Sequence, residues 1–331
     1  MEMNKHVVVG AGPVGIATAR HLVGAGAEQV VLVSRSGAGE DVAGVTRLAL
    51  DVADAAALAR VAEGASALYN CINPPSYDVW PTFWPPVAAA FLAAAESSGA
   101  VLVTASCLYA YGEVDRPMVE GMPDTADGAK GRVRARMWAD ALAAHEAGRL
   151  RAVEVRGSDY LGPGVSNAHI PVVAGKALRG RAVRVFGATD QPHTFTDVRD
   201  MAATLAAVAI TPSAHGRVWH APSNPPVTQA EAVAAVCRSA GLKAVTVRSW
   251  PRVMLSLGGV VVPFLREMRE TVHQFERPYV MDSSAAQREL GLAPTPWDEV
   301  CRATAAQAMS SHDPGATSTQ TGSRAGGALE V

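Results

Sequence analysis

Short apolar runs alternate with alanine-rich stretches of helical length along the first half of the chain. Between the apolar runs we predict helices over residues 14–23, 55–62, 86–98 and 131–147. The runs themselves predict strands at HVVVGA, QVVLVS, TRLALDV, SALYNC, AVLVTAS and RAVEVRGS. Strands buried on both faces of a parallel sheet read as nearly continuous apolar runs, and crossover helices join them. The pattern therefore predicts an α/β fold with a doubly wound parallel sheet.

The alternation of apolar runs and helical stretches becomes less regular after about residue 156. From DYLGPGVSNAHIP onward, loops rich in Gly, Pro and Asn separate shorter elements. We predict a sheet domain over residues 1–156 and a smaller, loop-rich substrate lobe mainly over 157–308, which partly returns to the sheet. Residues 309–331 are small and polar without periodicity, and we expect a disordered tail.

Composition narrows the class of protein. Hydrophobic residues make up 49% of the chain and charged residues 18%, and the net charge is −2. A chain of this charge has no strong positive potential to attract a nucleic acid or an anionic membrane. The four cysteines are scattered, which favours neither a disulfide framework nor a zinc site. The apolar run over 253–265 is too short to span a bilayer, and the strand-like start KHVVVGAG leaves no room for a secretory signal. We expect a cytoplasmic protein whose partner is a small molecule.

The segment VVVGAGPVGIATARHL places three glycines, Gly10, Gly12 and Gly15, between a predicted strand and a predicted helix. One glycine makes the tight turn, the second lets the backbone approach a pyrophosphate, and the third lets the helix pack on the strand. Pro13 and Val14 open the helix, whose free N–H groups would face the phosphates. The order of strand, loop and helix predicts a dinucleotide-binding Rossmann domain.

The second strand ends with Ser34, Arg35 and Ser36, where NAD-binding domains usually carry an acid. A cation between hydroxyl groups suits a 2′-phosphate, so we predict NADP(H) in preference to NAD(H); the alternative is a surface arginine. Asp51, followed by Val52, is placed to reach the adenine, although capping of the next helix explains it equally well. Further cofactor contacts are expected where the fourth and sixth strands end, at Cys71, Ile72, Asn73, Gly157, Ser158 and Tyr160.

Four segments resemble those of a known family, in the correct order and up to about residue 308. They are ASCLYAYG, VEVRGSDYLGPG, PHTFTDVRDMA and YVMDSSAAQRELGLAPT. With the glycine loop, they are similar to the extended short-chain dehydrogenase/reductase group, the NAD-dependent epimerase/dehydratase family. The resemblance implies hydride transfer with a Ser/Thr and a helical Tyr-x-x-x-Lys pair, in which the tyrosine exchanges a proton with the substrate and the lysine binds the ribose. It also implies a homodimer through the helices around Pro86 and Gly131.

The chain departs from that pattern, because none of its six tyrosines has a lysine four positions on. The Ser/Thr position holds Cys107, preceded by Ser106, and the helical pair becomes Lys130 and Arg134. A subset of the family resembles the chain in this departure. Arg134 can keep part of the lysine's role, and Lys130 can hold a carbonyl or an anionic substrate. The alternative is a solvated helix face, with Arg136–Asp140 as an ordinary i,i+4 pair.

The proton donor must then lie elsewhere, and Tyr109 is the first candidate. Tyr111 and Tyr160 match positions that are mostly structural in the family, and Cys107 is either a weak donor or a buried small hydrophobe. The segment PPSYDVWPTFWPP is either a rigid aromatic wall or a packed surface loop. Substrate contacts are expected from Tyr77, Trp80, Asn167, His169, His193 and His273, with loop hydrogen bonding as the alternative for the histidines.

We expect an NADP(H)-dependent oxidoreductase that acts on a small biosynthetic metabolite with an atypical active site. Two other functions stay open. One is a non-redox cyclase, isomerase or dehydratase on the same fold, and the other is a catalytically silent NADP(H)-binding protein. Metal-ligand spacings are absent from the sequence.

Overall fold

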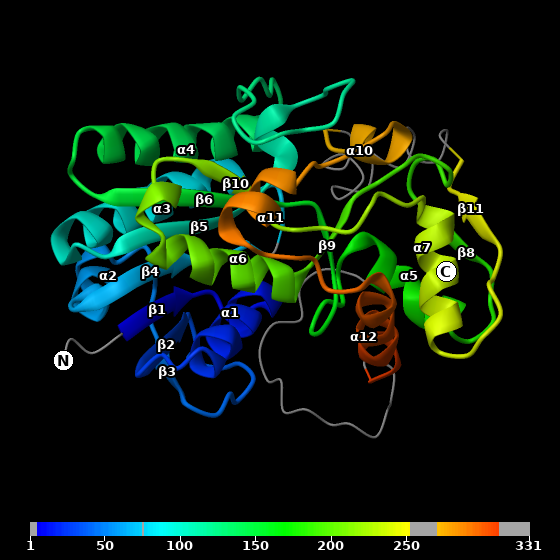
Figure 1. Ribbon diagram of the computed structural model, residues 1–331, viewed down its shortest axis with the longest axis horizontal. Helices are drawn as coiled ribbons and strands as arrows, with labels where there is room; N and C mark the ends of the chain where they lie inside the picture. Colours follow the sequence, from blue (N-terminus) through cyan, green and yellow to red (C-terminus); the bar gives the residue numbers. More distant parts are fainter. Residues whose placement is uncertain (1–4, 75, 252–269, 311–331) are drawn as a thin grey trace.

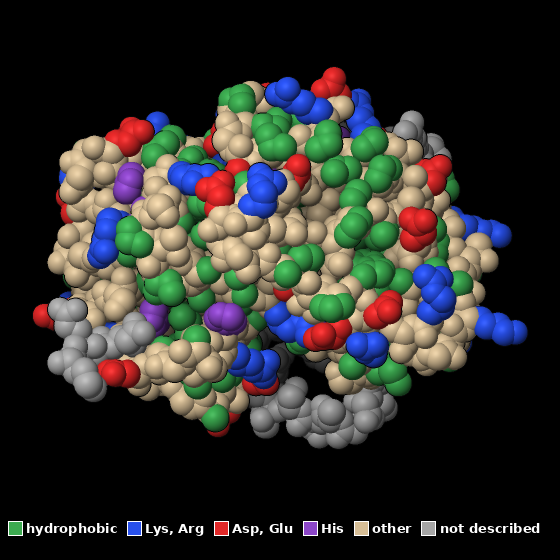
Figure 2. All heavy atoms as spheres, viewed as in Figure 1, with side chains coloured by type: hydrophobic (Ala, Val, Ile, Leu, Met, Phe, Trp, Pro, Cys, Tyr) green, Lys and Arg blue, Asp and Glu red, His purple; other side chains and the backbone are tan. Residues whose placement is uncertain are grey.

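The computed structural model describes residues 5–74, 76–251 and 270–310 of the 331-residue chain. The apolar run over 253–265 and all but the first two residues of the tail expected over 309–331 lie outside the described residues. Within those residues, every helix falls short of the length and apolar character that crossing a bilayer requires. Figure 2 shows basic and acidic side chains interspersed on the face in view, in keeping with a net charge near zero.

Seven parallel strands form the central sheet, in the order β10-β6-β5-β4-β1-β2-β3. Their bounds are β1 Lys5–Val9, β2 Gln29–Ser34, β3 Val45–Ala49, β4 Ala65–Asn70, β5 Val101–Cys107, β6 Arg151–Gly157 and β10 Val218–His220. The first six are the predicted strands, and the predicted doubly wound parallel sheet is confirmed. β10 comes from the second half of the chain and pairs with β6, so that half does return to the sheet.

Helices cover both faces of the sheet, with α4 on one side and α1 on the other (Figure 1). One layer is α1 Pro13–Gly24 and α6 Val198–Ile210; the other is α2 Ala55–Ala62, α3 Trp80–Ser98 and α4 Ala129–Glu146. Successive side chains of a strand point to opposite faces of the sheet and so pack against different helix layers. In β6, Ala152 packs in the α3–α4 core, whereas Val153 and Val155 pack in the α1–α6 core.

Helix α3 begins six residues before the predicted start at residue 86. The interpretation of this segment as a loop is therefore wrong from Trp80 onward. Trp80 and Trp84 are buried inside the α3–α4 core. The proline at the first turn gives up only an N–H that has no helical partner, and burial of two large aromatic rings offsets the cost of Pro85 and Pro86.

A second unit is attached at the carboxyl end of β6. It contains β7 Asp159–Leu161, α5 His169–Ala177, β8 Val183–Val185, β9 Phe195–Asp197, α7 Gln229–Ser239, β11 Val247–Ser249, α10 His273–Glu276 and α12 Trp297–Ser310. Helices α5, α7 and α12 lie together (Figure 1) and share two small apolar cores. Shorter connections are η1 Leu108–Tyr111, η2 Pro212–Ala214 and α11 Ser284–Leu290.

The register of the strands brings distant segments to one edge. Asn70 at the end of β4 lies opposite Val9 of β1 and Thr104 of β5, and Cys107 at the end of β5 lies opposite Gly157 of β6. The residues that follow these strands therefore meet at the carboxyl edge, beside the second unit. Open α/β sheets bind their ligands at this edge.

Candidate active site

The glycine loop between β1 and α1 has the geometry that a dinucleotide requires. Gly10 has a φ of 114°, and a Cβ there would lie 2.5 Å from the carbonyl oxygen of Cys71. A Cβ at Gly15 would lie 1.7 Å from the carbonyl oxygen of Gly10, so only glycine allows this approach of helix to strand. A Cβ at Gly12 would meet nothing within 4 Å, which leaves open space at the N-terminus of α1, where Pro13 begins the helix. The loop fits a pyrophosphate held by helix N–H groups.

The turn after β2 is organised by hydroxyl groups. Ser34 Oγ donates to the carbonyl of Ala38 at 3.0 Å, and the Ala38 N–H donates to Ser36 Oγ at 3.2 Å. The turn leaves Arg35 exposed at its tip. A 2′-phosphate on an adenosine ribose would meet a cation and hydroxyl groups here instead of an acid.

Asp51 does not cap helix α2, so that alternative is wrong. Asp54 is the N-cap, since its carboxylate accepts from the Ala57 N–H at 2.9 Å. Asp51 accepts from the Ala53 N–H at 3.1 Å and stays exposed, while Val52 beside it is buried.

The segment after β4 passes beneath the glycine loop. Cys71 is buried there, and the Ile72 N–H donates to Asn70 Oδ1 at 3.3 Å. Val14 is partly buried in the first turn of α1, and Asn73 is exposed. These predicted cofactor contacts thus surround the end of β4.

Two serine hydroxyls at the ends of β5 and β6 are buried without a hydrogen-bond partner among the described residues. They are Ser106 Oγ and Ser158 Oγ. Tyr160 packs over Gly157, because a Cβ at that glycine would lie 3.0 Å from the phenol oxygen. Buried polar atoms without partners are costly, so the two serines are candidate ligand contacts.

Lys130 and Arg134 are buried at the start of α4, with 3% and 4% of each residue exposed. The interpretation of this helix face as solvated is therefore wrong for both, although the Arg136–Asp140 pair forms as predicted, at 2.8 Å. Glu270 makes two hydrogen bonds to Lys130. Its carboxylate accepts from the Lys130 backbone N–H at 2.6 Å and from Lys130 Nζ at 3.1 Å. The ammonium group also lies 5.1 Å from the centre of the Tyr77 ring.

The Arg134 guanidinium is held by aromatic rings. Its Cζ lies 4.7 Å from the centre of the Trp80 ring and 4.3 Å from that of Trp84. Its Nε and Nη1 have no hydrogen-bond partner among the described residues. A desolvated cation over an aromatic face gains about 2 kcal/mol, so Arg134 ties α4 to α3 and places a positive charge beneath the site.

Two phenols meet above this charge. The hydroxyl oxygens of Tyr77 and Tyr109 are 2.9 Å apart. Burial raises the pKa of Tyr77 to about 12, and burial and the neighbouring Tyr77, Cys107 and Asp159 raise that of Tyr109 well above its usual value. Both phenols therefore stay protonated near neutral pH and act as hydrogen-bond donors. This weakens the case for Tyr109 as the group that exchanges a proton.

Cys107 and Tyr111 have other surroundings. Burial raises the pKa of the Cys107 thiol, which disfavours a thiolate. The Tyr111 hydroxyl hydrogen-bonds to His220 Nε2 at 2.8 Å, in a separate buried cluster.

The histidines predicted to contact substrate differ in their environments. His169 stacks on Phe275 with ring centres 4.0 Å apart, hydrogen-bonds to Gln229, and has a pKa lowered by burial to about 4, so it is neutral. His273 Nδ1 lies 3.1 Å from the Glu270 carbonyl oxygen, beside the group that holds Lys130.

His193 is 2% exposed, and its Nε2 lies 2.9 Å from Asp159 Oδ2. The predicted Asn167 is exposed in the loop before α5. The structure thus places His193 beside a carboxylate and leaves Asn167 at the surface.

Residues 6–220 match the model of the NAD dependent epimerase/dehydratase family. The chain belongs to this family. The resemblance seen in the sequence is thereby confirmed. Comparison with curated proteins gave no match.

Solved structures share the fold of this epimerase/dehydratase family member over nearly the whole chain. They include a dTDP-glucose 4,6-dehydratase from Bacillus anthracis in complex with NAD, at 14% identity and a TM-score of 0.75, covering 93% of this chain and 97% of that one. A UDP-glucose 4-epimerase from Thermotoga maritima with UDP-glucose has 16% identity and a TM-score of 0.74, covering 93% and 100%. A UDP-glucuronic acid 4-epimerase from Bacillus cereus with NAD has 15% identity and a TM-score of 0.75, covering 93% and 97%.

Sequence reasoning missed two carboxylates of this site. Asp159 comes two residues after β6, and a carboxylate at that position was the signal available. Glu270 lies 140 residues from Lys130 in the chain, and no local pattern connects the two. Both became visible only when the fold brought the second unit over the sheet edge.

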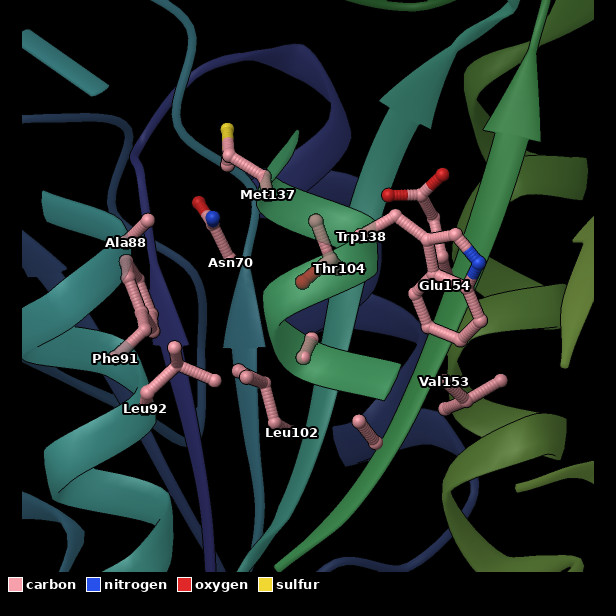
Figure 3. A pocket seen from close by; sticks show the side chains of 12 residues that line it. Asn70, Ala88, Phe91, Leu92, Leu102, Thr104, Met137, Trp138, Val153 and Glu154 are labelled. Carbon is pink, nitrogen blue, oxygen red and sulfur yellow. The ribbon is translucent and has the colours of Figure 1, made fainter. Parts of the chain in front are cut away.

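A small cavity lies between α3, α4 and the sheet (Figure 3). Its volume is about 20 Å³, and its polar lining is Asn70, Thr104 and Glu154. That volume holds about one water molecule, so the cavity is not a metabolite site. Among the described residues, no group of His, Cys, Asp and Glu side chains is arranged to hold a metal ion.

Proposed function

We propose that this family member is an NADP(H)-dependent oxidoreductase of the epimerase/dehydratase type, acting on a small biosynthetic metabolite with Lys130-x-x-x-Arg134 in place of Tyr-x-x-x-Lys. The observation that carries this proposal is the burial of Lys130 at the carboxyl edge of the sheet, beside two phenols and held by Glu270. A buried ammonium group is costly unless its charge is used or paired.

The cofactor would be held by the loop of Gly10, Gly12 and Gly15, with Arg35 and its flanking serines at the 2′-phosphate. When bound, the nicotinamide supplies or accepts the hydride. The open space beside Gly12 and the exposed cation after β2 support this assignment.

The chain's own side chains would polarise the substrate. The Lys130 ammonium donates a hydrogen bond to a substrate oxygen and stabilises negative charge on it, while Glu270 fixes its position from two directions. Tyr77 and Tyr109 donate further hydrogen bonds, and Arg134 adds positive charge from beneath. A cytoplasmic location and a homodimer through α3 and α4 stay predictions.

The test is a search for turnover with both cofactors. Purified protein is titrated with NADPH and with NADH by fluorescence, then assayed at the nicotinamide absorbance band with carbonyl, alcohol and imine compounds. We expect tighter binding of NADPH and a substrate-dependent change in absorbance. Absence of turnover with either cofactor would contradict an oxidoreductase, and product formation without net cofactor consumption would indicate the non-redox alternative.

Variants then locate the chemistry. Lys130→Ala should lower kcat about 100-fold or more, as removal of a buried donor to a developing oxyanion does. Tyr109→Phe should have a smaller effect, since its hydroxyl only donates a hydrogen bond. Arg136→Ala is the matched control, because this exposed arginine lies on the same helix and pairs with Asp140 at the surface. Thermal melts confirm that each variant is folded.

A further inference from the structure

Tyr77 and Tyr109 form a pair of phenols at the carboxyl edge of the sheet. Tyr77 lies in the segment between β4 and α3, and Tyr109 lies two residues after the end of β5. Their hydroxyl oxygens are 2.9 Å apart, and neither hydroxyl makes another hydrogen bond with a described residue. Each phenol carries one hydroxyl hydrogen, and the shared hydrogen bond uses only one of the two. The pair therefore keeps one hydrogen that a ligand can accept.

Packing holds the two rings in place. The centre of the Tyr77 ring lies 5.3 Å from that of Trp80 and 6.3 Å from that of Tyr109, and both phenols pack against the α3–α4 core. Trp80 is 2% exposed, so it anchors the Tyr77 ring to the interior. A side chain that is already fixed by packing loses little entropy when it binds a ligand. The pair is thus preorganised for a hydrogen-bond acceptor.

The edge beside the pair is accessible. Tyr77 and Tyr109 are partly exposed, and so is Cys107 at the end of β5. The side chain of Asp159, two residues after β6, is 21% exposed. Among the described residues, the titratable and charged groups that face Tyr77 are Tyr109, Cys107, Asp159, Lys130 and Arg134. Because open α/β sheets bind ligands at this edge, a substrate oxygen can approach the hydroxyl pair from the exposed side.

Positive charge favours Tyr77 as the phenol that gives up a proton. Lys130 Nζ lies 5.1 Å from the centre of its ring. Burial raises the pKa of Tyr77 to about 12, while the hydrogen bond with Tyr109 and the charge of Arg134 act in the opposite direction. Burial raises the pKa of Tyr109 well above its usual value, and there the charge of Tyr77 and the same hydrogen bond add to the increase. When the pair loses a proton, the Tyr109 hydroxyl therefore donates to a phenolate on Tyr77.

Tyr111 provides a matched contrast in the same short helix η1. It also lies beside a cation, since Arg156 Cζ is 4.4 Å from the centre of its ring. However, Tyr111 is 0% exposed, and its hydroxyl hydrogen-bonds to His220 Nε2 at 2.8 Å. A positive charge beside a phenol is thus combined with access from the sheet edge at Tyr77, and not at Tyr111.

Resting on the proposed function, we infer that Tyr77 is the catalytic acid and Tyr109 is its positioning residue. The substrate is a carbonyl compound, whose carbon receives the hydride and its electron pair from the reduced nicotinamide. The carbonyl π electrons move to oxygen, and the Tyr77 O–H bond breaks as its proton passes to that oxygen. The carbonyl is reduced to an alcohol, the nicotinamide is oxidised, and the Tyr77 phenolate recovers a proton from water. Until then, Lys130 and Arg134 stabilise the phenolate, and Tyr109 donates to it.

The first test needs no substrate. Cofactor-free protein is prepared with ring-fluorinated tyrosine, because fluorine lowers the pKa of a phenol, and its ionisation is followed by ¹⁹F NMR against pH while circular dichroism monitors the fold. Tyr77→Phe and Tyr109→Phe assign the two resonances.

We expect Tyr77 to ionise at a lower pH than Tyr109. Tyr109→Phe should raise the pKa of Tyr77, because the phenolate loses its hydrogen-bond donor, whereas Tyr111→Phe should leave that pKa unchanged. Ionisation of Tyr109 before Tyr77, or a Tyr77 titration that Tyr109→Phe does not move, would overturn the inference.

Turnover provides the second readout, with the carbonyl compound found in the cofactor assay. Tyr77→Phe should lower kcat about 10²–10⁴-fold with an unchanged Kd for NADPH. Tyr109→Phe should lower kcat about tenfold, as loss of a hydrogen bond to a charged group does, and Tyr111→Phe should keep the wild-type kcat. Full kcat in Tyr77→Phe would overturn the donor role while leaving the oxidoreductase proposal standing. A wild type without turnover would refute the proposed function, and the donor role with it.

Discussion

Substitutions in the glycine loop should distinguish effects on folding from effects on cofactor binding, because one of its glycines is tightly packed and another faces open space. A Cβ at Gly15 would lie 1.7 Å from the carbonyl oxygen of Gly10, whereas a Cβ at Gly12 would meet nothing within 4 Å. We therefore expect Gly15→Ala to destabilise the fold. Gly12→Ala should leave the fold intact and block the dinucleotide.

The magnitudes follow from these distances. An ordinary contact needs about 3.4 Å, so Gly15→Ala must push α1 away from the loop by roughly 1.7 Å. Overpacking of a rigid core costs about 1–3 kcal/mol and sometimes more, and backbone on both sides of this contact favours the upper end. At Gly12, φ is −83°, which alanine adopts freely, so the free energy of unfolding should change by less than about 1 kcal/mol.

Urea unfolding followed by tryptophan fluorescence measures stability, and fluorescence titration with NADPH measures binding. Gly12→Ala should weaken NADPH at least about tenfold, equivalent to 1.4 kcal/mol, with a wild-type unfolding midpoint. Wild-type NADPH affinity in a folded Gly12→Ala protein would refute the assignment of the open space to the pyrophosphate. A wild-type midpoint for Gly15→Ala would refute the packing argument.

Three further predictions concern other parts of the molecule. Arg35→Glu should weaken NADPH about tenfold or more and NADH little in a fluorescence titration, since a hydrogen bond to a charged group is worth about 1.5–3 kcal/mol. Arg156→Met should cost about 3–5 kcal/mol in urea unfolding, because buried Glu154 loses its partner at 2.7 Å. Burial lowers the pKa of His220 from 6.5 to about 4, so protons bind the unfolded chain first as the pH falls. About 3 kcal/mol of the free energy of unfolding is therefore present above pH 6.5 and is lost as the pH falls toward 4. In urea unfolding measured against pH, His220→Gln should reduce this loss of stability at acid pH.

Each of these has a clear opposing result. Equal losses of NADPH and NADH affinity in Arg35→Glu would place the arginine away from the 2′-phosphate. An Arg156→Met protein as stable as the wild type would show that losing the Arg156 partner leaves no uncompensated charge on buried Glu154. An unchanged loss of stability at acid pH in His220→Gln would assign that loss to other groups, such as His169.

The local sequence pattern was sufficient to predict most elements of the sheet domain. Six strands were predicted because strands buried on both faces leave apolar runs, and the glycine loop was predicted because its spacing is mechanical. The start of α3 was not, because the prolines and tryptophans from Trp80 onward resemble a loop until the burial of the rings is known.

Some features of the candidate site were likewise predictable from the sequence, and others were not. The resemblance of the sequence to the family identified Lys130 and Arg134 as the substituted helical pair, and the spacing of four residues places both on one face of a helix. Only the tertiary structure showed that both are buried, that Glu270 pairs with Lys130, and that Asp159 meets His193. The physical reason is range: hydrophobic periodicity and turn geometry act over a few residues, whereas the charge and protonation of a buried side chain depend on partners that the fold brings from far along the chain.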